Sequence, residues 1–278
     1  MLNTFQYDDL IIAELKEDIA YIDAATEFVI GDNSKSGAEI VAKSDGVLSG
    51  IKVAERVFKL VDDTILFKNY LKDGKPLTKG ARIATISGDT HSLLKAERTA
   101  LNFLQHMSGI ATATAACVAA VNGTNARVTD TRKTLPGLRR LQKYAVLCGG
   151  GRNHRYDLSS GGVLKENHIK AAGGITKAVT LFRQKQSHMT VLEVEVTNLK
   201  EFNEALSLGV PVIMLDNMTL ADMKSACTLN KGQAVIEASG GITLENIAAV
   251  AATGVDIISI GALTHSAKAA DITMLIAS

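Results

Sequence analysis

The strongest chemical signal in this sequence is a concentration of positive charge between Thr131 and Lys170. The window holds nine lysines and arginines against two acids, a net charge of +7, in a chain whose total is +1 at pH 7. A globular protein that gathers cations in this way is usually building a pocket for an anion that carries several charges. The sequence therefore favours a small-molecule anion site.

Not all of these cations fit a pocket equally well. Arg132 and Lys133 stand in tandem at the end of an apolar run and beside a rigid Pro136–Gly137 turn, which favours ligand binding. Lys165 also lies near the end of an apolar run, and a binding role is favoured over a solvated one. Three further cations lie on a predicted helix and fit the simpler expectation of solvated surface charge: Arg139, Arg140 and Lys143.

Carboxylates lie within or near the end of two later apolar runs. Glu193 and Glu195 are two residues apart, so on a strand both point to the same side. A carboxylate that faces the interior needs a cation or a metal, and at least one of the two is therefore expected to be functional. Asp216 follows the run Val212–Leu215 and has a similar status, although it could also cap the next helix.

Glycines at two other places predict a phosphate site. Ser239–Gly240–Gly241 follows an apolar run directly before a helix, and Gly261 ends the next run. Bare glycine amides and a helix N-terminus can approach an anion closely. His154 follows three glycines and is expected on a flexible approach to the pocket, whereas His168 is expected to play a supporting role.

These residues need a scaffold that brings strand ends together. Six apolar runs alternate with helix-like stretches: 126–131, 161–168, 190–197, 211–217, 233–241 and 256–264. The intervening helices are predicted over 175–186, 198–209, 219–229 and 243–254, with Asn198, Thr219 and Thr243 as caps. The alternation predicts an α/β barrel of the TIM type that is incomplete, with six strands. An open doubly wound sheet is the alternative.

The N-terminal part has a different pattern. Strands of a mixed or antiparallel sheet are predicted over 37–50, 63–71 and 81–88, and helices over 51–61, 90–107 and 112–121. We therefore expect an N-terminal α/β sandwich domain over 1–112 and a barrel catalytic domain over 113–268. The tail, 269–278, is a candidate to pack on the first domain.

Composition narrows the class of protein. The 278 residues are 46% hydrophobic, which is enough for a substantial core, and no apolar run is long enough for a transmembrane helix. The N-terminus lacks the features of a signal peptide, and three scattered cysteines are expected to be reduced thiols. With no Trp and no overall basicity, nucleic-acid binding is a poor fit. A cytoplasmic location without membrane or nucleic-acid partners is expected.

Several motifs resemble one family. The segments that carry the resemblance are ERTALNFLQHMSGIA (97–111), DTRKTLPGLRRLQKYAVLCGGGRNHRYDL (130–158), LKENHI (164–169), EVEV (193–196), IMLDN (213–217), ASGGI (238–242) and SIGALT (259–264). Together they are similar to the quinolinate phosphoribosyltransferase family over nearly the whole chain. The resemblance implies that quinolinate and phosphoribosyl diphosphate react, with Mg²⁺, to give nicotinate mononucleotide, diphosphate and CO₂ in de novo NAD synthesis. It also implies a head-to-tail homodimer with shared active sites.

The resemblance assigns a role to each matched residue. The substrate-binding set that it implies is Arg98 (from the partner chain), Thr131, Arg132, His154, Arg155 and Lys165. The catalytic set is Lys133, Glu195 and Asp216, of which Glu195 and Asp216 would also hold the metal. The phosphate-binding set is Ser239, Gly240, Gly241, Gly261 and Ala262.

Two other functions compete with this one. A relative associated with molybdenum utilisation shares the TRKT-x-PG motif, but it typically lacks a lysine at the position of Lys165. A non-enzymatic anion-binding module would not need Glu195 and Asp216 beside a cationic pocket.

Overall fold

The computed structural model describes residues 3–277 and divides into two compact units. The first unit comprises residues up to 115, 135–150 and 266–278, and the second comprises 116–134 and 151–265. The expected domains were 1–112, with 269–278 as a candidate to pack on it, and 113–268; the division differs chiefly in that 135–150 belongs to the first unit. One contact that links this segment to the rest of the first unit is the hydrogen bond that the Tyr144 hydroxyl donates to Asp73 Oδ2 at 2.8 Å.

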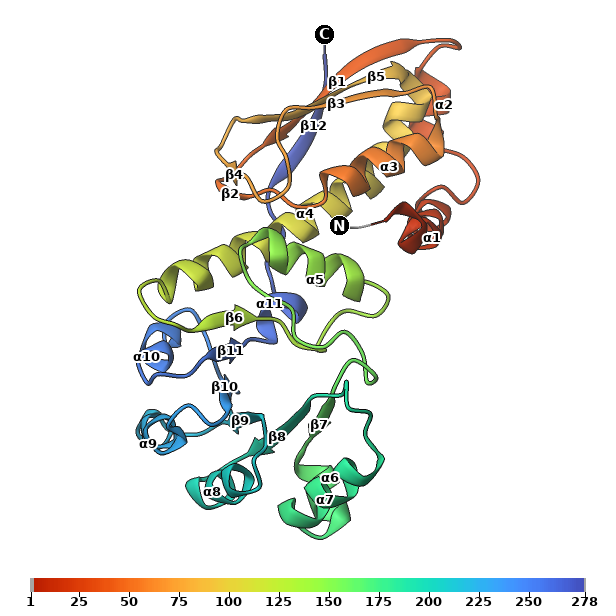
Figure 1. The fold of residues 1–278 in the computed structure, drawn as a ribbon. Helices are drawn as coiled ribbons and strands as arrows, with labels where there is room; N and C mark the ends of the chain where they lie inside the picture. Colours follow the sequence, from red (N-terminus) through yellow and green to blue (C-terminus); the bar gives the residue numbers. More distant parts are fainter. Residues whose placement is uncertain (1–2, 278) are drawn as a thin grey trace. The chain divides into compact units, whose positions relative to one another are not determined.

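The first unit is built on an antiparallel sheet with the strand order β12-β1-β5-β3. Its strands are β1 (Lys35–Ala42), β3 (Leu66–Asn69), β5 (Arg82–Asp89) and β12 (Ile272–Ile276), and a separate pair is formed by β2 (Gly46–Val47) and β4 (Pro76–Leu77). The C-terminal strand β12 pairs with β1 from Ala42↔Ile272 to Ala38↔Ile276. The tail therefore completes the sheet that the N-terminal strands begin (Figure 1).

The first unit also contains helices. They are η1 (Thr4–Gln6), α1 (Asp8–Asp18), α2 (Ala24–Val29), α3 (Ile51–Val61), α4 (Thr90–Ala120) and α5 (Arg139–Cys148). Helix α3 buries Val53, Ala54, Val57 and Phe58, a spacing that places them on one face of a helix. The Phe58 ring lies 5.9 Å from that of Phe67 on β3, so this face packs against the sheet.

Two sequence expectations for these helices are wrong. The stretches predicted over 90–107 and 112–121 form one continuous helix, α4, which includes Gly109. A side chain at Gly109 would lie 2.1 Å from the Lys268 carbonyl oxygen, so the glycine permits close packing by the C-terminal segment. Lys143, expected to be solvated, is a fully buried residue of α5.

The second unit is a parallel sheet of six strands in the order β6-β11-β10-β9-β8-β7. The strands are β6 (Arg127–Thr129), β7 (Gly162–Leu164), β8 (Leu192–Val196), β9 (Val212–Asp216), β10 (Val235–Ser239) and β11 (Ile257–Ser259). The described pairings do not join β6 to β7, so the barrel is not closed. Strands β7 to β11 lie side by side in chain order, and β6 pairs with β11, as in a barrel that is open between β6 and β7. A doubly wound sheet would instead reverse its strand order near the middle. The incomplete barrel is therefore confirmed and the doubly wound alternative is wrong.

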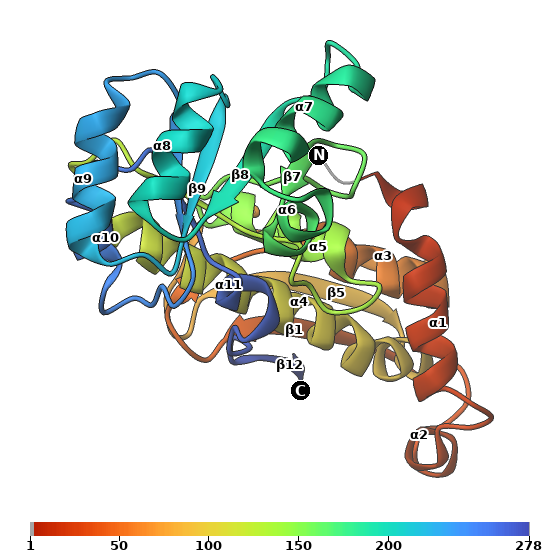
Figure 2. The same ribbon diagram turned by 90° about the horizontal axis from the view of Figure 1, so that it is seen from below.

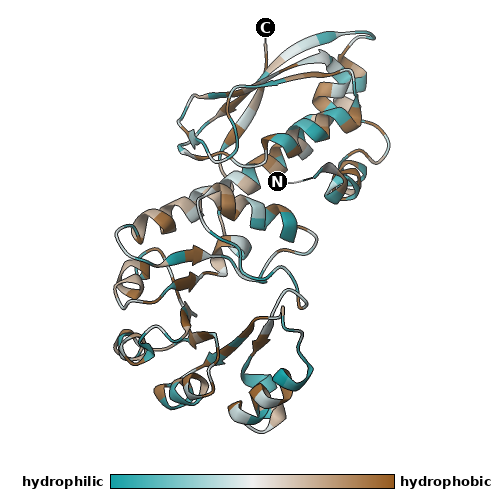
Figure 3. Cartoon of the chain, in the orientation of Figure 1, coloured by the Kyte–Doolittle hydropathy of each residue, from teal (hydrophilic) through white to brown (hydrophobic). Residues whose placement is uncertain are grey.

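The helices of this unit follow the strands in alternation. They are α6 (Glu166–Ala172), α7 (Ile175–Lys185), α8 (Leu199–Ser207), α9 (Leu220–Asn230), α10 (Ile247–Ala251) and α11 (Ala262–His265). Figures 1 and 2 show α8 and α9 on the outer side of β8 and β9, and Figure 3 shows the strands as mainly hydrophobic. Asn198 and Thr219 cap α8 and α9 as expected. Thr243 does not cap α10, which begins only at Ile247.

In residues 3–277 the structure describes no helix with the length and apolarity needed to cross a bilayer. All three cysteines are free thiols: Cys117, Cys148 and Cys227.

Candidate active site

A cavity of about 300 Å³ lies in the second unit, at the carboxyl ends of the barrel strands. Four cations line it: Arg132, Lys133, Arg155 and Lys165. Three carboxylates also line it: Glu195, Asp216 and Glu237. Thr131, His154, Ser239 and Ser259 add polar groups. Nine of the residues singled out from sequence therefore meet in one cavity, which is the arrangement expected of a barrel active site.

Lys133 lies in the loop after β6. Hydrogen bonds fix its backbone, and a neighbouring glycine leaves room for its side chain. The Lys133 N–H donates to Thr131 Oγ1 at 3.0 Å, and the Thr264 hydroxyl donates to the Lys133 carbonyl oxygen at 2.7 Å. A Cβ at Gly261 would lie 2.9 Å from Lys133 Cδ. The absence of a side chain at Gly261 thus lets the Lys133 side chain lie across the end of β11.

Asp130 attaches the segment that carries His154 and Arg155 to β6. Its carboxylate is fully buried and accepts hydrogen bonds from the His154 N–H at 2.9 Å and from Asn153 Nδ2 at 2.6 Å. A parallel bridge between Thr129 and Arg152 continues the same attachment. Sequence reasoning missed Asp130, although an acid inside the run that leads to Arg132 was an available signal.

The side chain of Arg155 is also held by a hydrogen bond. Its Nη1 donates to the Gly161 carbonyl oxygen at 2.7 Å. Burial, and then the positive charge of Arg132, lower the pKa of the Arg155 guanidinium. The two guanidinium groups therefore repel each other, and an anion that contacts both relieves this repulsion.

Lys165 forms an ion pair across the cavity, with its Nζ 2.6 Å from Glu195 Oε2. The Lys165 side chain is half exposed, whereas that of Glu195 is mostly buried. Lys165 also precedes α6, and its backbone N–H donates to His168 Nδ1 at 3.1 Å. His168 therefore closes the first turn of α6, which fits the supporting role expected for it.

A buried cluster lies beneath these groups. His154 Nε2 is 3.1 Å from Glu193 Oε2 and 3.6 Å from Glu237 Oε1, while the Arg155 backbone N–H donates to His154 Nδ1 at 2.8 Å. Burial, and then the charge of Glu193, raise the pKa of Glu237 to about 7. Both ring nitrogens of His154 thus face protein groups. Sequence reasoning did not single out Glu237, although it stands two residues before Ser239 on the same side of β10.

The glycines after β10 are required by the backbone. Gly240 and Gly241 have φ angles of 90° and 61°, a region that favours glycine. A Cβ at Gly240 would lie 2.3 Å from Asn217 Oδ1, and the Asn217 N–H donates to the Ser239 carbonyl oxygen at 2.9 Å. Gly240, Gly241, Gly261 and Ala262 do not line the cavity itself, but Ser239 does. Their phosphate-binding role stays a prediction.

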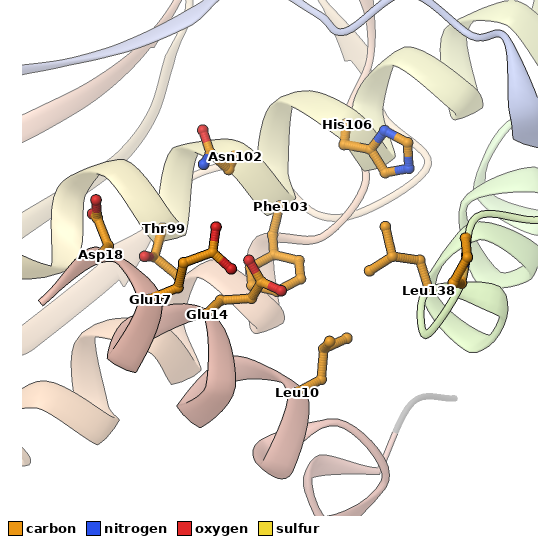
Figure 4. A pocket seen from close by; sticks show the side chains of 10 residues that line it. Leu10, Glu14, Glu17, Asp18, Thr99, Asn102, Phe103, His106 and Leu138 are labelled. Atoms are coloured by element: carbon orange, nitrogen blue, oxygen red, sulfur yellow. The ribbon is translucent and has the colours of Figure 1, made fainter. Parts of the chain in front are cut away.

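Arg98 belongs to the first unit, where it is exposed on α4. A separate cavity of about 430 Å³ lies in the same unit, where Glu14, Glu17 and Asp18 of α1 face Asn102 and other residues of α4 (Figure 4). None of the residues that line it is a lysine or an arginine. Although it is the larger cavity, its acidic wall is unsuited to a dianion, and the barrel cavity is the better candidate.

Comparisons with known proteins agree over the full chain. Models of the C-terminal and N-terminal domains of quinolinate phosphoribosyl transferase match residues 110–275 and 23–108. A nicotinate-nucleotide pyrophosphorylase (carboxylating) of Mycobacterium leprae is 39% identical over 283 residues, covering 98% of this chain and 99% of that protein. A quinolinate phosphoribosyltransferase (decarboxylating) 1b of Nicotiana tabacum is 39% identical over 292 residues, covering 98% and 83%.

Solved structures give the same answer for the fold. The crystal structure of NadC from Streptococcus pyogenes is 44% identical, superposes with a TM-score of 0.96, and covers 100% of this chain and 98% of that one. Both domain models, the relatives and the solved structure indicate the same family. The chain belongs to the quinolinate phosphoribosyl transferase family.

Proposed function

We propose that this protein is a nicotinate-nucleotide pyrophosphorylase: it transfers the phosphoribosyl group from phosphoribosyl diphosphate to quinolinate and releases CO₂ and diphosphate. The observation that carries the proposal is the barrel cavity, in which four cations converge beside two carboxylates on neighbouring strands, Glu195 and Asp216. The names of the relatives support it, since one is called carboxylating and the other decarboxylating. The product, nicotinate mononucleotide, would serve NAD synthesis.

The cations suit quinolinate, whose two carboxylates need two sets of donors. Arg132 and Arg155 present guanidinium groups that can each bind a carboxylate through two hydrogen bonds. Lys165, which follows β7 directly, supplies a third charge. His154 contributes chiefly by its place beside Arg155, because its ring nitrogens face Glu193 and the Arg155 backbone.

Glu195 and Asp216 suit Mg²⁺. They offer hard oxygen ligands, which Mg²⁺ prefers, and they lie on adjacent strands of the sheet. Both line an open cavity, which leaves room for substrate phosphates and water as the remaining ligands. When bound, Mg²⁺ would neutralise charge on the diphosphate group. The two carboxylates would hold it and would also stabilise the positive charge that develops on the ribose.

The leaving diphosphate and the 5′-phosphate need their own contacts. Lys133 would balance the charge of the diphosphate: its backbone is hydrogen-bonded to Thr131 and Thr264, and it lines the cavity. Ser239 and the amides of Gly240, Gly241, Gly261 and Ala262 would hold the 5′-phosphate at the ends of β10 and β11. Glycine at these positions lets an anion approach the backbone closely.

The proposal includes a homodimer with shared active sites. Arg98 is exposed on α4, so it is accessible to a partner chain. In this arrangement Arg98 from the partner would complete the set of cations around quinolinate. No nucleic acid or membrane is needed for any part of the reaction.

One assay tests the function. Purified protein is incubated with quinolinate, phosphoribosyl diphosphate and Mg²⁺, and nicotinate mononucleotide and CO₂ are both measured. We expect equal amounts of the two products, and little turnover when nicotinate replaces quinolinate. Binding of quinolinate without release of CO₂ would instead identify an anion-binding module, and absence of both would favour the relative associated with molybdenum utilisation.

A further inference from the structure

Glu237 has no part in the function described above, yet it lines the active-site cavity. It is 2% exposed, and its Oε1 has no hydrogen-bond partner among the described residues. Ser259, at the end of the neighbouring strand β11, is also 2% exposed, and its hydroxyl interacts with the Glu237 carboxyl group. Buried polar atoms without partners are rare in native proteins, and they ask for an explanation.

The surroundings of Glu237 explain which proton state it adopts. Glu193 faces it from β8, His154 from the segment after α5, Ser259 from β11, and Lys165 acts on it from the end of β7. His154 Nδ1 accepts the Arg155 N–H, so the ring donates only through Nε2. That donor lies at hydrogen-bonding distance from Glu193, at 3.1 Å, and beyond it from Glu237, at 3.6 Å.

Two buried carboxylates therefore share one neutral imidazole donor. Oxygens of Glu193 and Glu237 lie within 4.8 Å of each other. Two negative charges this close in a poorly solvated site cannot both form without a large cost, so one carboxyl group keeps its proton. Glu193 is the carboxylate that is hydrogen-bonded to His154, so Glu237 keeps it. Burial and the charge of Glu193 raise the pKa of Glu237 to about 7, which agrees with this assignment.

The depth of Glu237 in the barrel matches the place of the pyridine ring. Glu237 and Ser239 point to the same side of β10, and two residues of a strand span about 6.6 Å. If Ser239 contacts the phosphoribosyl group at the strand ends, the ring that is attached to that group lies one layer deeper. Glu237 stands in that layer, at the level of Met214 on β9.

We propose that Glu237 is the acid that protonates the pyridine carbon from which CO₂ departs. This inference rests on the proposed function. After phosphoribosyl transfer the ring nitrogen is cationic, and the bond between C2 and its carboxylate breaks with loss of CO₂. The electron pair stays on C2 and takes the proton of the Glu237 carboxyl group, so that a C–H bond forms and an O–H bond breaks. Solvent returns a proton to Glu237 once the product has left, because Glu193 disfavours a second charge.

The test separates the two chemical steps in a single turnover. Glu237→Gln keeps the shape and the neutral charge of the protonated acid but removes the acidic proton. Diphosphate release reports phosphoribosyl transfer, and nicotinate mononucleotide reports decarboxylation followed by protonation. We expect quinolinate affinity and diphosphate release to stay within about threefold of wild type. Nicotinate mononucleotide formation should fall at least tenfold, since a positioned general acid typically contributes about 10²–10⁴-fold, and the carboxylated mononucleotide should accumulate.

Other results would overturn the inference. Formation of nicotinate mononucleotide at the wild-type rate in Glu237→Gln would show that water supplies the proton. Parallel loss of quinolinate binding and diphosphate release would show that Glu237 only supports His154. If Glu237→Gln does not fold, Glu237→Asp and the wild type decide: the second step should slow with rising pH while the first does not, and a common pH profile for both steps contradicts the proposal. If the wild type releases no diphosphate at all, the proposed function fails instead.

Discussion

Lys165 Nζ lies 2.6 Å from Glu195 Oε2, so a residue proposed to bind quinolinate is paired with one proposed to bind the metal. Each neutralises the other while the substrates are absent. Binding of quinolinate at Lys165 and of Mg²⁺ at Glu195 would compete with this ion pair, and the two binding events are therefore expected to be coupled. Each ligand lowers the cost of binding the other, because each breaks the same ion pair.

Glu195→Gln tests this coupling. The variant keeps the shape of the side chain and removes the charge that holds Lys165, so quinolinate should bind at least as tightly as in wild type. Turnover should collapse by at least 100-fold, because the charge that serves the metal and the ribose is lost. Calorimetry gives the affinity and the product assay gives the rate.

Asp216→Asn is the matched control: in the described part of the chain Asp216 forms no ion pair with a lysine, so this variant should lose turnover with quinolinate affinity unchanged. Weaker quinolinate binding in Glu195→Gln would reverse the assigned roles.

Quinolinate should outcompete nicotinate strongly. If Arg132, Arg155 and Lys165 contact two carboxylates, nicotinate loses the contacts to one of them. A charged hydrogen bond contributes about 1.5–3 kcal/mol, so binding should weaken by roughly 10- to 100-fold. Competition between the two acids in a binding assay measures the ratio. Equal affinity for the two acids would contradict the assignment.

The barrel could be predicted because its signals are local. Each strand from β6 to β11 is a short apolar run, and each following helix shows apolar residues at helical spacing. The pairing of these strands then brings Arg132, Lys165 and Asp216 together, since parallel strands end at one edge. The location of a residue at the end of a predicted strand was therefore enough to identify most of the residues that line the cavity.

What could not be predicted depends on contacts between distant segments. The sequence predicts separate helices over 90–107 and 112–121, but Gly109 lies within one helix, α4, where the backbone of Lys268 approaches it. Lys143 was expected to be solvated, but it is fully buried in the first unit. In the sequence Glu237 is an isolated acid in an apolar strand. It belongs to a cluster with His154 and Glu193 only because the fold brings β8, β10 and the segment that carries His154 together.

The stability of the protein should depend on pH through Glu237. Burial, and then Glu193, raise the pKa of Glu237 from 4.5 to about 7, so between these values the folded chain keeps a proton that the unfolded chain has lost. Rising pH in this window therefore destabilises the fold, by up to about 3 kcal/mol, whereas the contribution is fully present below pH 4.5. Urea unfolding at pH 5 and pH 8 measures the change. Glu237→Gln should lose this part of the pH dependence, and parallel curves for both proteins would contradict the expectation.

Gly261→Ala should impair the phosphoribosyl side of the site without unfolding the protein. The new methyl group would lie 2.9 Å from Lys133 Cδ, so the lysine side chain must move. We expect about a tenfold loss in kcat/KM for phosphoribosyl diphosphate, which corresponds to about 1.4 kcal/mol, with quinolinate affinity unchanged. The effect should vanish when Lys133 is already alanine. An equal loss in the Lys133→Ala background would place the cause elsewhere, for example at the phosphate itself.

Arg98 should act on the active site of the partner chain. It is exposed on α4 in the first unit, whereas the cavity is built by the second unit. Arg98→Ala and Lys165→Ala are each expected to be inactive, and the two variants are unfolded together, refolded and assayed. Random pairing makes about half of the dimers mixed, and each mixed dimer then has one doubly altered site and one intact site, so about a quarter of all sites should recover. If Arg98 serves its own chain, every site keeps one alteration and no activity returns. Refolding each variant alone provides the control for recovery that does not depend on mixing.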